Sequence, residues 1–343
     1  MATQTVGNYY NLVTAGAIKD GSRLDVMLSE KNPMPRDMAV FAANEKMGHT
    51  GTRVTSLATG AFRKVSGFKT PGTSTFTPYH DDISIFYGQS VVPDDVKRLE
   101  GAAKVAQMES THEEGYWQGI ARHIIEGDAS TTPEKYDGLG VRYNTPDNGD
   151  STFDATNPDP DTAAQVNVLD AGGTGSDTMS IWFLRHGEGQ VGLITPMNDP
   201  QFGLTMKDKG LMEEADGTDS TNPVGTRDIW KKEWEWWHGL SVGNHKCVAR
   251  IRNIESSLDA IDASIKRLIY QTFEELMTEG TGAIWMYCPR RMMTHFQILL
   301  EAKQNVIFSK DNPYDTEMIM WAGKSPIQSC DSLSITETAV EAV

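Results

Sequence analysis

The longest stretch of periodic hydrophobic residues lies between Pro93 and Gly127. Its apolar side chains recur mostly at steps of three and four, with polar Ser110 and Glu113 between them, and this spacing predicts one face of a single helix of about nine turns. Pro93 and the two aspartates after it are typical of a helix start, and Gly127 is positioned to end the helix as a left-handed cap. The periodic residues are Val96, Leu99, Ala103, Ala106, Trp117, Ile120 and Ile124, and the helix contains Gly101, Gly115 and Gly119.

The segment before this helix has the pattern of a hairpin without a core. Residues 52–65 and 73–86 are rich in Thr, Val, Phe and Ile and are separated by turn residues, which predicts two strands. A two-stranded ribbon is marginal alone in water, so it needs a second surface. That surface is either a larger sheet of the same chain or another subunit. Residues 1–40 are small and polar, which is typical of a tail or of an arm that a neighbour orders.

The rest of the chain alternates strands and helices. Strands are predicted at 180–184, 228–252, 283–288, 319–321 and 327–336, and helices at 255–279 and 289–305. Residues 189–194 are predicted to form a hairpin turn that leads from the first of these strands into another strand. The pattern predicts the α+β class, with roughly two domains for 343 residues.

The residues around the long helix resemble a known family. Ile85-Phe86-Tyr87-Gly88 precedes it, and a phrase from Pro133 to Tyr143, Pro-Glu-Lys-Tyr-Asp-Gly-Leu followed by Arg-Tyr, comes after it. With the order of the elements, these phrases resemble the major capsid proteins of tailed bacteriophages, the family with the HK97-like fold. The resemblance implies an N-terminal arm (1–40), an E-loop hairpin with peripheral-domain strands (41–92), a spine helix with the following turn of the peripheral domain (93–145), a compact axial domain (146–325) and a C-terminal strand returning to the peripheral domain (326–343).

The same resemblance implies a function and partners. The chain would self-assemble into pentamers and hexamers of an icosahedral head that encloses double-stranded DNA, with non-specific contact to that DNA. Scaffolding, decoration and portal proteins would be its partners, the host cytoplasm its place of assembly and the virion its location. Another virion component, which would form a tube or a ring, is the related alternative.

Candidate contact residues lie in two places. Phe62, Phe68 and Phe76 are apolar side chains of the predicted E-loop, with Arg63 and Lys64 as ion-pair partners. Trp234 and Trp236 share one face of a predicted strand, where tryptophan is typical of a core or a subunit interface. Arg250 and Arg252 alternate along the same region and would bind a partner's carboxylates or face the shell lumen.

One motif suggests a different class of protein. Leu184-Arg185-His186-Gly187-Glu188 matches the signature of histidine phosphatases, in which the histidine is phosphorylated and the arginine holds the phosphate. No α/β repeat precedes the motif, and a hairpin turn follows it. We keep a phosphatase built on Arg185 and His186 as the alternative hypothesis.

Composition narrows the remaining possibilities. The net charge of −16 disfavours sequence-independent DNA binding, which depends on neutralising phosphates. Three separated cysteines predict no disulfide framework, and the sequence shows no secretory signal or membrane span. Asp154, Asp159 and Asp161 lack the ligand spacing of a calcium loop. The eight histidines form no metal motif, so we expect no catalytic residue, no metal and no cofactor.

Overall fold

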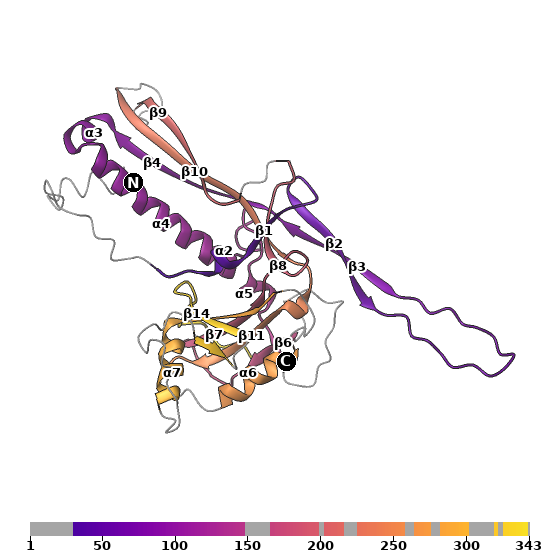
Figure 1. Cartoon of the computed structure of the whole chain (residues 1–343). Helices are drawn as coiled ribbons and strands as arrows, with labels where there is room; N and C mark the ends of the chain where they lie inside the picture. Colours follow the sequence, from indigo (N-terminus) through magenta and orange to yellow (C-terminus); the bar gives the residue numbers. More distant parts are fainter. Residues whose placement is uncertain are drawn as a thin grey trace. The chain divides into compact units, whose positions relative to one another are not determined.

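The computed structural model describes residues 30–147, 165–198, 202–215, 225–257, 264–275, 282–301, 319–321 and 325–341 (Figure 1). It confirms the α+β class, since helices and sheets both occur. The chain forms two compact units. Unit 1 contains described residues of 85–120 and 201–237, and unit 2 contains those of 30–84, 121–200 and 238–341.

Unit 1 is built on a small sheet and a helix. Strand β10 (Thr226–Val242) pairs with β9 (Thr205–Ala215) and with β4 (Ser84–Pro93). The helix is α4 (Ala102–Glu126), preceded by the short helix α3 (Asp94–Glu100). Residues 202–237 therefore belong with the long helix, whereas the sequence analysis assigned them to the axial domain.

The predicted single helix is interrupted at Gly101. This residue has a φ of 81°, and its N–H donates to the carbonyl of Lys97, so α3 ends there and α4 begins with Ala102. Only glycine adopts this conformation at little cost, which explains the break.

The predicted end of the helix is correct, but the predicted left-handed cap at Gly127 is wrong. Glycine is needed there for space. A Cβ would lie 2.6 Å from the carbonyl oxygen of Tyr136.

Unit 2 contains a seven-stranded sheet with two helices beside it (Figure 1). Helices α6 (Ser264–Glu275) and α7 (Arg290–Glu301) pack Ile265, Ile269 and Phe296 into the apolar core of this sheet. The strand order is β13 (Ile319–Trp321), β14 (Ser325–Ser329), β12 (Ile284–Cys288), β7 (Thr178–Arg185), β11 (Val248–Glu255), β6 (Gln165–Asp170) and β5 (Pro146–Asp147).

Three predictions about this region differ from the structure. The helix predicted from 255 begins at Ser264 among the described residues, because β11 continues through Glu255. The last strand does not return to the sheet of β4, since β14 pairs in parallel with β12. Most of the turn predicted at 189–194 is instead strand β8 (Val191–Thr195), which joins a second sheet with β1 (Ala39–Ala42) and the end of β10.

Unit 2 also carries an antiparallel hairpin where the sequence predicts the E-loop. Its strands are β2 (Gly48–Ser56) and β3 (Thr75–Asp82), shorter than predicted, and residues 57–74 connect them. We call residues 48–82 the β2–β3 hairpin and residues 57–74 its tip. Short helices α2 (Met34–Asp37) and α5 (Leu139–Arg142) complete the described elements of unit 2, with a 3₁₀ turn at His245–Cys247.

Candidate assembly surfaces

The β2–β3 hairpin forms because β-branched and aromatic residues alternate along both strands. Cross-strand pairs run from Gly48 opposite Asp82 to Ser56 opposite Thr75, where the two hydroxyls lie 2.5 Å apart. Val54 pairs with Phe76, and both side chains are largely exposed. Near Val54 and Phe76 the ribbon is thus held by its ladder, while these side chains stay open to solvent.

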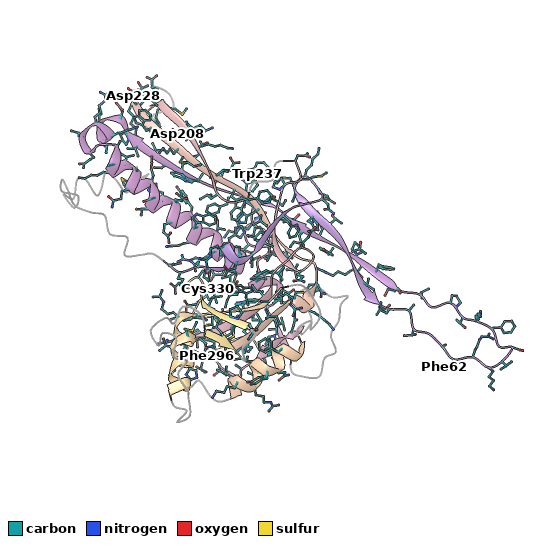
Figure 2. The ribbon with its side chains drawn as sticks, viewed as in Figure 1. Phe62, Asp208, Asp228, Trp237, Phe296 and Cys330 are labelled. Atoms are coloured by element: carbon teal, nitrogen blue, oxygen red, sulfur yellow. The ribbon has the colours of Figure 1, made fainter. Side chains whose placement is uncertain are left out.

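The tip exposes large apolar side chains. Phe62 and Phe68 are fully exposed, as is Val65, and Leu57 is nearly so. Figure 2 shows Phe62 at the far end of the hairpin, away from the other labelled residues of unit 2. Exposed apolar groups gathered on one segment make the tip a candidate contact surface.

The hairpin also differs in charge from the whole chain. Residues 49–80 contain Arg53, Arg63, Lys64 and Lys69 and no Asp or Glu, although the chain carries a net charge of −16. Within the tip, Arg63 donates to the carbonyl of Gly67 at 3.1 Å, which leaves Lys64 and Lys69 to project from an exposed loop. A basic segment of an acidic protein is electrostatically complementary to another copy of that protein.

The structure places the sequence-predicted contact residues in two different environments. The structure brings Phe62, Arg63, Lys64, Phe68 and Phe76 together on the hairpin. Trp234 and Trp236 are only 2% and 1% exposed. Their rings lie 5.5 Å from Tyr116 and 5.7 Å from Trp117 of α4, so we assign both to the core of unit 1 rather than to a surface.

The sequence analysis missed several exposed apolar residues. Leu57 and Val65 belong to the hairpin tip, and Met206 and Leu211 lie half-exposed on β9, which pairs with β10 alone among the described strands. The signal for Leu57 and Val65 was present, since both lie in the segment whose pattern predicts a hairpin without a core. Nothing in the sequence of β9 distinguishes an exposed methionine from a buried one.

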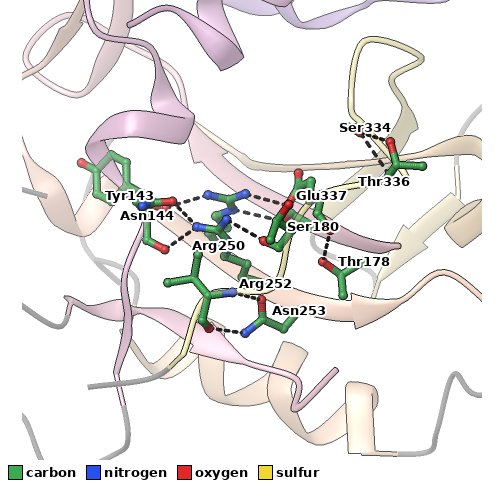
Figure 3. A network of polar contacts seen from close by, with 12 residues as sticks. Tyr143, Asn144, Thr178, Ser180, Arg250, Arg252, Asn253, Ser334, Thr336 and Glu337 are labelled. Carbon is green, nitrogen blue, oxygen red and sulfur yellow. Dashed lines mark hydrogen bonds and ion pairs between the residues drawn. The ribbon is translucent and has the colours of Figure 1, made fainter. Parts of the chain in front are cut away.

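Arg250 and Arg252 do not face a partner or a lumen, because both are buried in a polar network within unit 2 (Figure 3). Arg250 donates to Glu337 at 2.8 Å, to the hydroxyl of Ser180 at 3.0 Å and to the carbonyl of Tyr143 at 2.9 Å. Burial is the main cause that lowers the pKa of Arg250, to about 10, and Glu337 opposes the shift.

The same network fastens the C-terminal segment, which we define as residues 330–341. Arg252 donates to the carbonyl of Thr338 at 3.2 Å, and Asn253 exchanges two hydrogen bonds with the backbone of Val340. The N–H and carbonyl of Glu337 pair with those of Thr178 on β7. These contacts order a segment that has little strand structure of its own.

The phosphatase motif does not form a phosphate site in this structure. Nε2 of His186 lies 2.8 Å from the hydroxyl of Tyr287, which donates to Asp37 at 3.3 Å. Burial lowers the pKa of His186 to about 4, and Arg185 is buried at the end of β7. The rings of Trp285 and Tyr287 lie beside His186, and no second histidine ring contacts it in the described part of the chain.

Among the described residues, no group of three His, Cys, Asp or Glu side chains is placed to hold a metal ion. None of the described helices is long and apolar enough to cross a membrane. Asp154, Asp159 and Asp161, which lack the ligand spacing of a calcium loop, lie outside the described residues.

These features together define the class of protein. A long helix, a two-stranded hairpin without a core and a separate sheet with two helices form the fold of the HK97-like capsid proteins of tailed phages. A chain of the near-atomic-resolution structure of bacteriophage Epsilon15 has this fold, with a TM-score of 0.72 and 19% identity over 99% of each chain. The family model described as Major capsid protein GP7 matches residues 20–341, and the chain belongs to this family.

Other solved structures resemble the chain less. The bacteriophage JBD30 capsid matches with a TM-score of 0.48 and 10% identity over 94% of this chain and 97% of that one. The procapsid of the same phage matches with a TM-score of 0.39 and 10% identity over 90% and 94%. No curated protein sequence matches the chain. By its family, the protein is a major capsid protein of phage heads, a class that builds multimeric shells in the virion.

Proposed function

We propose that the chain assembles into pentamers and hexamers of an icosahedral head that encloses double-stranded DNA. The observation that carries this proposal is the tip of the β2–β3 hairpin, whose aromatic and basic side chains have little to contact within their own chain. Burying one phenylalanine contributes about 1.5–3 kcal/mol, so two per subunit, repeated around a shell, supply a substantial association energy.

The partners of the hairpin follow from its chemistry. The tip is apolar and basic, and the chain as a whole is acidic, so a neighbouring copy offers carboxylates for Lys64 and Lys69. The ion pairs would steer subunits together and weaken with salt, whereas Phe62 and Phe68 would hold them once docked.

The finer assignments extend the same proposal. The head would be assembled in the host cytoplasm, with a scaffolding protein, a portal protein and a decoration protein as further partners. Contact with the packaged DNA would be non-specific, as expected for an acidic wall that repels most of the DNA surface. The N-terminal arm would add contacts between neighbours, although residues 1–29 lie outside the described part of the chain.

The test shortens the hairpin without disturbing its ladder. Leu57–Ser74 are replaced by Asn-Gly, a two-residue turn suited to a hairpin, so that Ser56 and Thr75 remain the last pair. We expect a folded subunit, by circular dichroism, that forms no closed shells by electron microscopy and light scattering. A matched variant replaces the same residues with a Gly/Ser linker of equal length.

The outcomes separate the alternatives. Loss of shells in both variants supports contacts made by the tip, and normal shells from either variant would overturn the proposal. Tubes or open rings from the wild-type chain would favour another virion component.

A further inference from the structure

The β2–β3 hairpin is attached to the rest of unit 2 close to its base. Its two strands pack chiefly against each other. At its base, the ring of His49 lies 5.7 Å from the ring of Phe41 on β1, and the side chain of Asn44 exchanges two hydrogen bonds with the backbone of Thr50. Arg53 on β2 and Asp81 on β3 make its charged contacts to β10 and α5. Figure 1 shows the hairpin extending from this base toward its tip. Whatever sets the direction of the hairpin must therefore act through a few residues.

Asp81 is held by a buried ion pair. Nη1 of Arg142 donates to Oδ1 of Asp81 at 2.6 Å, and the two side chains are 16% and 3% exposed. The same guanidinium donates through Nε to the carbonyl of Asp137 at 2.9 Å and through Nη2 to that of Leu240 at 3.2 Å. Since a guanidinium is a planar, rigid fork, these bonds fix β3 against both α5 and the end of β10.

Arg53 makes a second attachment from the other strand. Its guanidinium donates to the carbonyls of Val242 at 2.5 Å and Gly243 at 3.2 Å, and it lies 4.1 Å from the centre of the Tyr79 ring. Gly243 is itself fixed, because its N–H donates to the carbonyl of Gln190 at 2.8 Å. Arg53 thus ties β2 to a point that the turn after β7 already holds.

A close backbone approach lies beside these two attachments. A Cβ at Gly239 of β10 would lie only 2.1 Å from the carbonyl oxygen of Asp82, so no side chain separates the two strands there. The hairpin is therefore held at three points, which are the backbone approach at Gly239 and the guanidinium groups of Arg53 and Arg142. Three such points are sufficient to define the direction of the hairpin.

We propose that Arg142, Asp81 and Arg53 form a latch that sets the direction of the β2–β3 hairpin relative to the sheets of unit 2. They are positioning residues for assembly, because a tip that contacts a neighbour must be presented at a defined angle. This role in assembly rests on the proposed function, whereas the latch itself is measurable in the unassembled subunit.

The experiment measures the direction of the hairpin. Spin labels are attached to Phe62→Cys at the tip and Glu134→Cys at an exposed position of unit 2, and their distance is measured by double electron–electron resonance. The native thiols Cys247, Cys288 and Cys330 are buried, so they compete little for the label. The wild-type latch should give one narrow distance distribution.

Two variants open the latch in different ways. Asp81→Asn removes the charge but keeps the size of the side chain, and Arg53→Gln removes a guanidinium whose acceptors are uncharged carbonyls. Each should broaden the distribution and make the amides of β2 and β3 exchange about tenfold faster or more, with the circular dichroism spectrum unchanged. Arg227→Gln breaks the exposed pair with Glu214 on β9–β10 and serves as the matched control, which should change neither quantity.

The results separate the latch from general stabilisation. An unchanged distance distribution in Arg53→Gln would overturn the latch even if Asp81→Asn fails to fold. Broad distributions with lost shell formation support both the latch and its role in assembly. Broad distributions with normal shells would overturn the role in assembly and leave the latch in place.

Discussion

The tip of the β2–β3 hairpin and the C-terminal segment both contain little regular structure, yet their environments are opposite. The tip exposes Phe62 and Phe68 completely, whereas the C-terminal segment buries Leu333 and places Glu337 against Arg250. One irregular segment is ordered by polar contacts inside the chain, and the other presents apolar groups that its own chain leaves exposed. Lack of secondary structure therefore does not by itself identify an assembly element, and the location of the contacts does.

The largest expected effect on stability tests the contacts that hold the C-terminal segment. Glu337→Ala leaves the guanidinium of Arg250 buried without its carboxylate, so the free energy of unfolding should fall by about 3–5 kcal/mol. Urea denaturation of the unassembled subunit measures the change. Glu341→Ala, at an exposed position of the same segment, is the control and should stay within about 0.5 kcal/mol of wild type. A loss below about 1 kcal/mol for Glu337→Ala would mean that the segment is not fastened by this pair.

The sequence predicted the elements better than their partners. The helix from Asp94 to Glu126, apart from its break, and the E-loop hairpin follow from periodicity and turn residues. The pairing of β14 with β12 does not, because strand partners depend on tertiary packing and not on local pattern.

For the site residues too, the local features were predictable and the tertiary contacts were not. Phe62 and Phe68 were predictable as apolar side chains in a segment without a core. Trp234 and Trp236, by contrast, have the composition of an interface but are covered by α4 within their own chain. Arg250 and Arg252 appeared to be surface residues because Glu337, the partner of Arg250, and Thr338, which accepts from Arg252, are distant from them in sequence.

The pH dependence of stability should come from the buried region and not from the tip. Burial, with Arg53 and Arg142 nearby, lowers the pKa of His245 to about 3, so this histidine is neutral in the fold. As the pH falls below about 6.5, the unfolded chain takes up a proton that the folded chain does not. The free energy of unfolding should decline by about 2 kcal/mol from about pH 6.5 to about pH 5 through this group.

Comparing the wild type with a His245 variant isolates the contribution of this histidine to the pH dependence of stability. In urea denaturation series, His245→Gln should remove the share of the pH dependence that this histidine carries, and the share of His186, whose pKa burial also lowers, should remain. An equal slope in wild type and His245→Gln would show that the buried histidine does not carry the effect.

A smaller effect on stability should distinguish strain in the backbone of Asn253 from the loss of its hydrogen bonds. Asn253 has a φ of 57° and hydrogen bonds to Asp170 and Val340. Asn253→Gly and Asn253→Ala both lose these bonds, but only glycine accepts the left-handed backbone freely. The alanine variant should therefore be less stable than the glycine variant by about 1 kcal/mol in urea denaturation. Equal stabilities would show that the backbone relaxes at this position.

The smallest effect on the subunit should accompany the largest effect on the shell. Changing Phe62 and Phe68 together to serine removes only exposed apolar surface, so the free energy of unfolding should stay within about 0.5 kcal/mol of wild type. Light scattering and electron microscopy should nevertheless show few closed shells, because the tip loses its apolar contacts with the neighbour. The matched control changes Ala58 and Ala61 of the same tip to serine and should assemble normally. A destabilised subunit would mean that the tip packs within its own chain, and the contrast with the C-terminal segment would then no longer hold.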